Sequence, residues 1–369
     1  MSTRKRVGIL TFHRAYNFGS ALQAYALNRF LNMCGFEAKT IDFVPNKQKT
    51  IYSMPKLSFS LHAVALRLLY RLNKKATMTR FFKFDNFVKN HIVLTSKQFN
   101  ENDTFESLNE QFDAFVVGSD QIWNPRCDDF SDIYLLPFVQ EKKNRIAYSP
   151  SLGSADLPRE YIELFKNNLS KFNFISLREK RSCDFINHLV NKDVVMTPDP
   201  VFLLSQSEWL EIKKDCSLNK KYILCYFIGN VKGMRSFCKR VAKRNKCNVV
   251  VLNANLREYF YNNKKLFNCG PEEFLDLIKN AHLVCTDSFH AAAFSLIFNK
   301  EFLAFKKDNN GAPDERLISM LDYFDLEKRI VNSDSFCLES VEKIDFQRIN
   351  EKLSKFRQIG IDYLKESLV

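Results

Sequence analysis

The chain of 369 residues is longer than an ordinary single domain and fits two domains of roughly 150 to 200 residues, each able to bury its own core. Its composition, 46% hydrophobic and 26% charged, is that of a globular protein and excludes long disordered spans. A formal net charge of +13 indicates an anionic partner, such as a phosphorylated small molecule, an anionic membrane or nucleic acid. The sequence has no zinc-finger spacing, helix-turn-helix cue or aromatic-and-basic platform, so we expect no nucleic-acid partner.

The ten cysteines are scattered along the chain and never form a Cys-x-x-Cys pair. This usage predicts reduced, buried thiols rather than a disulfide framework or a zinc site. The N-terminus runs straight into an apolar segment without a signal-peptide pattern, and no stretch of 18 apolar residues occurs. We therefore expect a cytoplasmic protein without a metal or other cofactor, at most peripheral to the inner face of a membrane.

The first part of the chain, residues 1–204, predicts an α/β lobe. Its elements begin with a strand at 6–12, a helix at 20–34 and a strand at 36–43. Strand, helix and strand within about forty residues indicate a right-handed βαβ unit with a parallel sheet. The turn after the first strand contains Asn17 and Gly19, at the sheet edge where open α/β folds bind ligands. These two residues either bind substrate or only close their turn.

A basic, amphipathic insertion at about 56–90 interrupts this lobe. Four apolar residues of the insertion share one helical face: Leu61, Ala65, Leu68 and Leu72. One interpretation is a helix packed on the domain with a solvated basic face. The other is a surface that lies on anionic lipid.

Three further strands of the first lobe each end in a polar loop. The strands are expected at 114–117, 145–148 and 172–177; Asp120 and Arg178 lie in the loops, and Tyr148 is the last residue of its strand. Loops that follow successive parallel strands line the same edge of a sheet, so these side chains are candidates for one site. Structural alternatives exist as well: Asp120 as a helix N-cap, Trp123 as core, and Arg178 in an ion pair with Glu179 or Asp184. Asp199-Pro200 then marks the expected hinge.

The second lobe is expected at 205–340, with strands at 222–227, 248–252, 282–285 and 302–305. The C-terminal segment 341–369 predicts a helix that crosses back to the first lobe. Within the second lobe, Cys285-Thr-Asp-Ser-Phe-His290 lies between an apolar run and a helical stretch, which predicts a strand, a tight turn and a helix N-terminus. Such a turn can bind an anion, with the His290 ring directed at it. Alternatively, Asp287 or Ser288 merely caps the helix and His290 is structural.

Eight stretches in order along residues 7–321 are similar to those of polysaccharide pyruvyl transferases, the bacterial enzymes of capsule and exopolysaccharide synthesis. They include Asn17-Phe-Gly-Ser-Ala-Leu-Gln, Val117-Gly-Ser-Asp-Gln-Ile-Trp123, Ala147-Tyr-Ser-Pro-Ser-Leu-Gly153, Ile175-Ser-Leu-Arg-Glu179 and Thr286-Asp-Ser-Phe-His290. The resemblance implies an α/β fold of two Rossmann-like lobes, as in glycosyltransferases of the B type, with a cleft between them.

The resemblance also implies transfer of pyruvate from phosphoenolpyruvate onto two hydroxyls of one sugar, which gives a cyclic ketal and phosphate without a metal. In relatives, an arginine after a first-lobe strand and an Arg-Leu-His turn hold the donor. The first matches Arg178, and the second matches Ser288-Phe289-His290. Ser288 departs from the family's arginine, and Lys306 or Lys307 could supply the missing charge.

His290 suits proton transfer, because a histidine side chain gains or loses a proton near neutral pH, and its counterpart would be Asp120, Asp287 or Tyr148. The acceptor could be a lipid-diphosphate-linked sugar. A rival hypothesis is a nucleotide-sugar glycosyltransferase of the same fold. It would need a carboxylate for the ribose, and the sequence identifies none among Asp276, Asp287 and Asp314. A third hypothesis is a non-catalytic sugar-binding protein.

Overall fold

A computed structural model describes most of the chain. The described residues are 4–51, 61–216, 218, 220–229, 234–252, 266, 268–306, 314–331 and 342–369, without the side chains of 49–51, 61–74 and 235. They form two compact units, which we describe separately. Unit 1 comprises Met1–Ser53, Val88–Leu204 and Leu353–Val369, and unit 2 comprises Met54–Phe87 and Ser205–Lys352.

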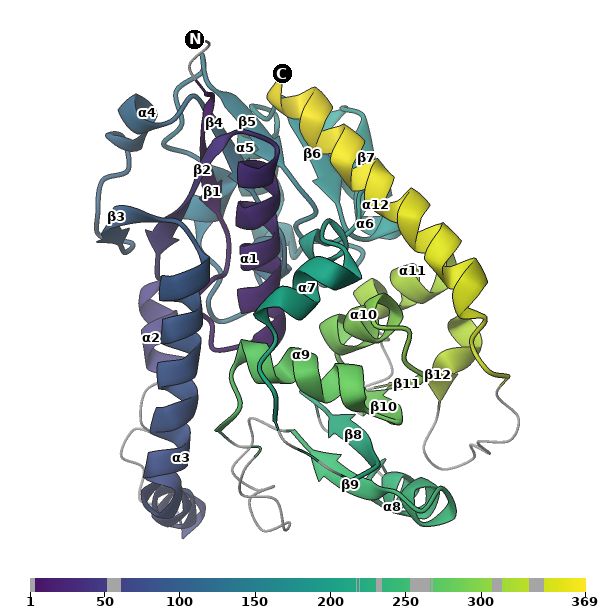
Figure 1. The fold of residues 1–369 in the computed structure, drawn as a ribbon. Coiled ribbons are helices and arrows are strands. Elements are labelled where there is room, and N and C mark those ends of the chain that lie inside the picture. Colours follow the sequence, from purple (N-terminus) through teal and green to yellow (C-terminus); the bar gives the residue numbers. More distant parts are fainter. Residues whose placement is uncertain are drawn as a thin grey trace. The chain divides into compact units, whose positions relative to one another are not determined.

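Unit 1 contains a seven-stranded, fully parallel sheet (Figure 1). Its strands are β1 (Arg6–Leu10), β2 (Glu37–Phe43), β3 (Leu94–Phe99), β4 (Ala114–Val117), β5 (Asn144–Ala147), β6 (Phe174–Leu177) and β7 (Val194–Met196). The order across the sheet is β3-β2-β1-β4-β5-β6-β7. The inner strands β1 and β4 are apolar and buried on both faces, as expected of a parallel sheet covered by helices.

The helices of unit 1 are α1 (Phe18–Met33), α2 (Asn46–Ile51), α4 (Leu108–Gln111), α5 (Ile162–Leu169) and α6 (Lys180–Val190). Short 3-10 helices are η1 (Gln121–Trp123), η2 (Asp132–Leu135), η3 (Arg159–Tyr161) and η4 (Pro200–Phe202). Two phenylalanine rings of the core, those of Phe165 and Phe172, meet the Trp123 ring edge-on, with centroids 6.3 and 5.7 Å away. The core interpretation of Trp123 is therefore confirmed.

Unit 2 contains a five-stranded parallel sheet in the order β12-β11-β10-β8-β9. The strands are β8 (Tyr222–Tyr226), β9 (Asn248–Val251), β10 (Leu283–Thr286), β11 (Phe302–Phe305) and β12 (Ile330–Val331). Its helices are α7 (Gln206–Ile212), α8 (Met234–Arg244), α9 (Pro271–Asn280), α10 (Phe289–Ile297), α11 (Glu315–Tyr323) and the 3-10 helix η7 (Glu327–Arg329). Two parallel sheets in one chain confirm the predicted α/β class.

Two long helices each contain one of the boundaries between the units: α3 (Leu61–His91) and α12 (Phe346–Leu368). The sequence placed the insertion 56–90 in the first lobe, whereas the structure groups residues 54–87 with unit 2, where Lys83 of α3 forms an ion pair with Glu273 of α9. The end of α12 belongs to unit 1. Its Tyr363 hydroxyl donates to the carbonyl of Ala147 at 2.8 Å.

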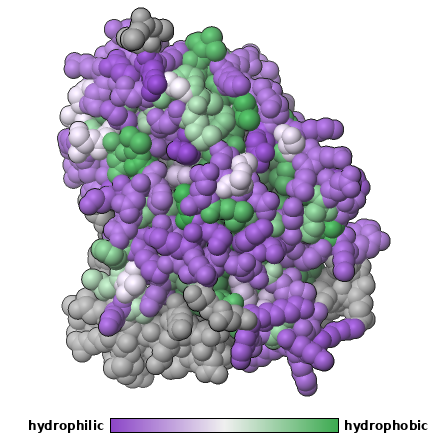
Figure 2. Space-filling model, viewed as in Figure 1, coloured by the Kyte–Doolittle hydropathy of each residue, from purple (hydrophilic) through white to green (hydrophobic). Residues whose placement is uncertain are grey.

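In Figure 2, one face of the molecule is mainly hydrophilic, with apolar residues in small patches. Within the described part of the chain, no helix combines the length and apolarity needed to cross a membrane. The nine cysteines of this part are free thiols, five of them buried.

Candidate functional site

In unit 1, the loops after β1, β4, β5 and β6 leave the sheet at the same edge, because these strands are parallel and β1, β4, β5 and β6 are consecutive neighbours. These loops contain the candidate residues of the first lobe. The edge is the usual ligand-binding edge of an open α/β sheet. Geometry within unit 1 therefore brings the predicted polar loops together.

The loop after β4 is held by close backbone contact. Gly118 has a φ of +129°, and a Cβ there would lie 2.0 Å from the carbonyl oxygen of Tyr148, so only glycine fits. The N–H of Ser119 donates to the Gln23 side-chain oxygen at 3.1 Å. The Ser119 hydroxyl lies 2.7 Å from the Ser149 carbonyl and 3.0 Å from Asp199 Oδ2, both acceptors.

Asp120 follows directly, with a φ of +68°. Its Oδ1 accepts the N–H of Gln121 at 2.9 Å, so the interpretation as a helix N-cap is confirmed. Its Oδ2 accepts the hydroxyl of Ser20, in the first turn of α1, at 2.5 Å. The carboxylate is thus fixed by its own loop and by helix α1, and its catalytic role stays a prediction.

Arg178 is buried, with 5% of its surface exposed, and lies among carboxylates. Its Nη1 donates to Asp199 Oδ2 at 2.5 Å, its Nη2 lies 3.7 Å from Asp120, and its Nε lies 3.5 Å from Glu179. Of the two acids that the sequence offered as ion-pair partners, Glu179 is thus near the guanidinium, and Asp184 pairs with Lys180 at 2.7 Å. The planar guanidinium can hold several such partners in fixed directions. Arg178 is therefore rigidly oriented at the carboxyl end of β6.

Tyr148 is completely buried at the end of β5. Its ring lies 6.0 Å from that of Tyr363, and a Cβ on Gly360 would lie 2.4 Å from its hydroxyl oxygen. Burial, and secondarily the charge of Asp199, raise the pKa of Tyr148 well above 10. Tyr148 packs against α12 and keeps its proton. This packing is a structural role that competes with its predicted role in substrate binding.

The loop after β1 has mainly structural contacts. The side chain of Asn17 accepts the N–H groups of Gly19 at 2.9 Å and Ser20 at 3.4 Å, which makes Asn17 the N-cap of α1. The turn-closing interpretation is confirmed, and substrate contact by Asn17 and Gly19 stays a prediction. Nearby, His13 is buried and contacts Asp42 at 2.9 Å, while Arg14 holds the same carboxylate with two hydrogen bonds.

In unit 2, the strand, turn and helix predicted around residue 287 are present as β10 and α10. Ser288 is the N-cap, since its hydroxyl accepts the N–H of Ala291 at 3.4 Å. Asp287 is buried, and its two oxygens accept the N–H groups of Ile228 and Gly229, each at 2.7 Å. Asp287 thus ties the loop after β8 to the turn after β10. This structural use of both oxygens competes with a catalytic role.

His290 is the second residue of α10 and is 6% exposed. Its ring meets that of the buried Phe289 edge-on, with centroids 5.1 Å apart. Lys306 is exposed after the end of β11, the strand next to β10. Lys307 lies outside the described residues. Unit 2 therefore holds an imidazole at a capped helix start, with an exposed ammonium after the neighbouring strand.

The carboxylates that a ribose would need in unit 2 are bound within the protein. Asp276 accepts from Lys213 at 2.9 Å and from the N–H of Cys216 at 2.9 Å. Asp314 caps α11 and forms two hydrogen bonds with the guanidinium of Arg316. Together with the engagement of Asp287, these contacts disfavour all three as ribose ligands.

Three residues of the unit 1 network were missed as site candidates: Ser20, Gln23 and Ser119. Gln23 donates to Thr11, Phe12 and Ser20 and accepts from Ser119, so it joins the loops after β1 and β4. Ser20, Gln23 and Ser119 all lie in the stretches that carried the family resemblance. The available signal was Gln23 itself, a polar residue within the apolar run Ala21 to Leu27 of α1.

Comparison with known proteins decides the family. The sequence model of the polysaccharide pyruvyl transferase family matches residues 17–309, a range that contains Asp120, Arg178 and His290. The chain belongs to the polysaccharide pyruvyl transferase family. Pyruvyl transfer is the activity for which this family is described, and the predicted family is confirmed. No curated protein sequence matches the chain.

Solved structures similar to this family member include a protein of uncharacterized function from Klebsiella pneumoniae, with 15% identity, a TM-score of 0.39, and coverage of 85% of this chain and 96% of that one. UDP-GlcNAc 2-epimerase from Neisseria meningitidis has 12% identity, a TM-score of 0.44 and coverage of 99% and 94%. The glycosyltransferase SnogD from Streptomyces nogalater has 11% identity, a TM-score of 0.40 and coverage of 98% and 96%. At these TM-scores the similarities carry no argument, and the description of the fold rests on the strand orders of the two sheets.

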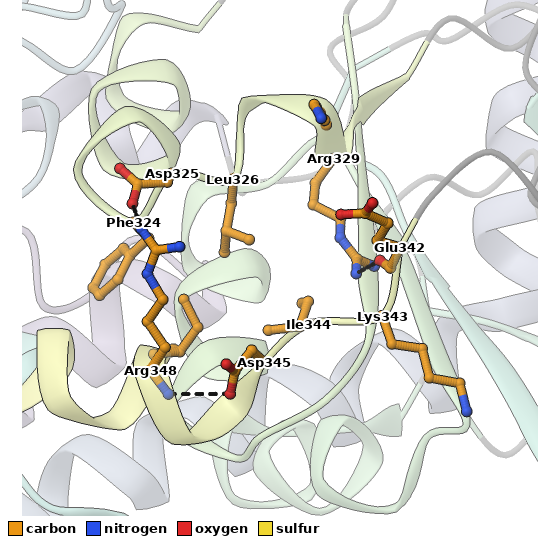
Figure 3. Close-up of a pocket in the computed structure, with 11 residues that line it drawn as sticks. Phe324, Asp325, Leu326, Arg329, Glu342, Lys343, Ile344, Asp345 and Arg348 are labelled. Carbon is orange, nitrogen blue, oxygen red and sulfur yellow. Dashed lines mark hydrogen bonds and ion pairs between the residues drawn. The ribbon is translucent and has the colours of Figure 1, made fainter.

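A separate pocket of about 170 Å³ lies in unit 2, between the end of α11 and the start of α12 (Figure 3). Charged side chains of both signs line it, among them Asp325, Arg329 and Arg348. Arg348 forms an ion pair with Asp325, and Asp345 accepts the backbone N–H groups of Gln347 and Arg348. None of the predicted site residues lines this pocket.

Proposed function

We propose that this member of the family transfers pyruvate from phosphoenolpyruvate to two hydroxyls of one sugar residue in a capsule or exopolysaccharide precursor. The products are a cyclic pyruvate ketal and phosphate. The observation that carries the proposal is the family match over residues 17–309, within which His290 lies in the first turn of a capped helix after the central strand β10 of unit 2.

The donor carries a phosphate and a carboxylate, so it requires cationic groups and backbone N–H donors. In unit 2, the start of α10 offers the positive end of a helix dipole, and Lys306 offers an exposed ammonium. In unit 1, Arg178 has its fork fixed by Asp199. We assign donor binding to Arg178, Ser288, Phe289 and Lys306. Lys307 keeps its sequence-based assignment.

The reaction needs one proton delivered and two removed. A proton added to C3 of the enol makes C2 electrophilic, and the first sugar hydroxyl forms a bond to C2 as it loses its proton. The second hydroxyl then attacks the same carbon as the C–O bond to phosphate breaks, and its proton is also released. We assign the proton delivery to His290, a step typically worth about 10²–10⁴ in rate. Asp120 and Asp287 are the candidates for removing the hydroxyl protons.

The rival function, a nucleotide-sugar glycosyltransferase, fits the site less well. Asp276, Asp287 and Asp314 each hold protein groups, which disfavours them as ribose ligands. The third hypothesis, a non-catalytic sugar-binding protein, leaves His290 and the oriented Arg178 unexplained. The acceptor we propose is a lipid-diphosphate-linked sugar, and the reaction is proposed to need no metal or cofactor.

The test is phosphate release from phosphoenolpyruvate over a panel of galactosyl and N-acetylmannosaminyl acceptors, with and without chelator. We expect release that requires an acceptor and persists in chelator. Binding can be checked by thermal unfolding, because a ligand at a hundredfold excess over Kd stabilises the native state by about 2.7 kcal/mol. Stabilisation and turnover with a nucleotide sugar alone would favour the glycosyltransferase. Activity that is lost in chelator and restored by magnesium would contradict the proposal that the reaction needs no metal.

A further inference from the structure

Helix α3 presents two large apolar side chains to solvent. Met78 is 55% exposed and Phe82 is 64% exposed. Residues four positions apart in a helix are neighbours on one face, so the two form a small continuous apolar patch. Different residues of α3 pack inward, among them Phe84 and Phe87, which are almost completely buried. Met78 and Phe82 therefore contribute little to the core of unit 2.

Positive charge accompanies this patch. Lys75 is exposed three positions before Met78 and lies on the same face. Lys74, Arg71 and Arg67 continue the same helical spacing in the sequence, and their side chains lie outside those that the structure describes. Between residues 56 and 90 the sequence has eight Lys or Arg and only one acidic residue.

Two of the basic residues of α3 have roles within the protein, which distinguishes them from those near the patch. Arg80 is buried, with its guanidinium 5.3 Å from the centre of the Phe84 ring. Lys83 pairs with Glu273. The exposed Lys75 has no such packing role among the contacts of the described residues. The helix thus divides into a packed face and a basic, partly apolar exposed face.

We infer that the face of α3 that contains Lys75, Met78 and Phe82 docks on an anionic phospholipid surface. Apolar and aromatic side chains on such a helix enter the boundary between headgroups and acyl chains, while lysines and arginines contact the anionic headgroups. A patch of two apolar residues is much smaller than the roughly 800 Å² per partner of a stable protein interface, so the observations favour lipid over protein. The inference deepens the proposed function, because a lipid-linked acceptor would be displayed at that surface, yet the binding itself is independent of catalysis.

The test is co-sedimentation of the full-length protein with vesicles of phosphatidylcholine and phosphatidylserine, compared with phosphatidylcholine alone. We expect binding to the mixed vesicles that weakens with salt. The double variant Met78→Gln, Phe82→Gln should bind at least tenfold more weakly, whereas Met33→Gln, which changes a similarly exposed methionine of α1 in unit 1 (51% exposed), should bind normally. Lys75→Glu should weaken binding by about fivefold or more, since each basic group near an anionic surface contributes about 1 kcal/mol.

Circular dichroism and thermal unfolding check that each variant is folded. Unchanged sedimentation of the double variant, or equal binding to neutral vesicles, would overturn the inference. Concentration-dependent self-association in analytical ultracentrifugation that disappears in Phe82→Gln would also overturn it, in favour of a second copy as the partner. Turnover of a water-soluble acceptor should be the same in all these variants. If the proposed function is wrong, the wild-type protein would show no pyruvyl transfer and would still bind the vesicles.

Discussion

Replacement of Gly118 by alanine tests how strictly the loop after β4 is determined. A Cβ at this position would lie 2.0 Å from the carbonyl oxygen of Tyr148, and this atom belongs to the backbone and cannot rotate away. The φ of Gly118, +129°, is also rarely adopted by L residues. Gly35 is a matched control, because its φ of +89° is positive but a Cβ there would meet no atom within 4 Å.

The two substitutions should therefore differ in how much stability they cost, because only the Cβ at position 118 meets a backbone atom. Gly35→Ala should lower the free energy of unfolding by about 1–2 kcal/mol through backbone strain. Gly118→Ala should add the cost of overpacking, about 1–3 kcal/mol, to a similar strain. Urea unfolding followed by circular dichroism measures both values, and calorimetry should show the larger shift in Tm for Gly118→Ala.

Turnover should separate the variants further. Gly118 precedes Ser119 and Asp120, whose side chains contact Asp199 and Ser20, so a shifted loop displaces the candidate site. We expect Gly35→Ala to keep near wild-type turnover and Gly118→Ala to lose most of it. Equal losses of stability in the two variants would refute the reasoning, because they would show that a Cβ at Gly118 adds no steric cost to the backbone strain that both variants share.

Three further predictions concern individual side chains. His290→Gln should lower kcat by about 10² or more with nearly unchanged phosphoenolpyruvate affinity, measured by phosphate release and calorimetry; equal losses of binding and turnover would contradict the proton-transfer role. Arg178→Lys keeps the charge but not the planar fork, so donor affinity should fall by about 30-fold, the equivalent of about 2 kcal/mol; normal calorimetric binding would contradict the assignment. The pKa of Asp42 lies well below its ordinary 3.8, because hydrogen bonds from His13 and Arg14 outweigh the opposing effect of burial. A carboxyl whose pKa is lower in the folded than in the unfolded state stabilises the fold at pH values above its unfolded pKa, and this stabilisation is lost as the pH falls. The stability advantage of wild type over Asp42→Asn should therefore shrink below about pH 4. An advantage that stays constant as the protein is unfolded by acid would contradict this prediction.

Local patterns in the sequence predicted the elements that build the candidate site. The apolar run Ala281 to Val284 and the small polar residues after it predicted β10 and the helix start at Ser288, because capping and strand burial act over a few residues. By contrast, β3 was not predicted. Its sequence, Leu-Thr-Ser-Lys-Gln-Phe, is polar, as an edge strand allows, and its pairing with β2 is a contact distant in sequence.

The side-chain partners of the candidate residues could not be predicted for the same reason. The sequence offered Glu179 and Asp184 as possible ion-pair partners of Arg178, and its shortest contact is with Asp199, 21 positions away. Asp287 was a candidate for capping α10 or for catalysis, and its two oxygens accept the backbone N–H groups of Ile228 and Gly229, which are 59 and 58 positions away. Spacing along the chain carries no information on such contacts, which depend on how the strands are ordered in each sheet.

The central claim, that the protein forms a pyruvate ketal from phosphoenolpyruvate, is tested most directly by following a labelled donor into the product. Phosphoenolpyruvate labelled with carbon-13 at C2 would be incubated with the enzyme and a sugar acceptor, and the product examined by NMR and mass spectrometry. We predict that the labelled carbon appears as a ketal carbon bonded to two oxygens of one sugar residue, in an amount equal to the phosphate released. An acceptor that gains a sugar from a nucleotide sugar, and no labelled carbon from phosphoenolpyruvate, would contradict the claim.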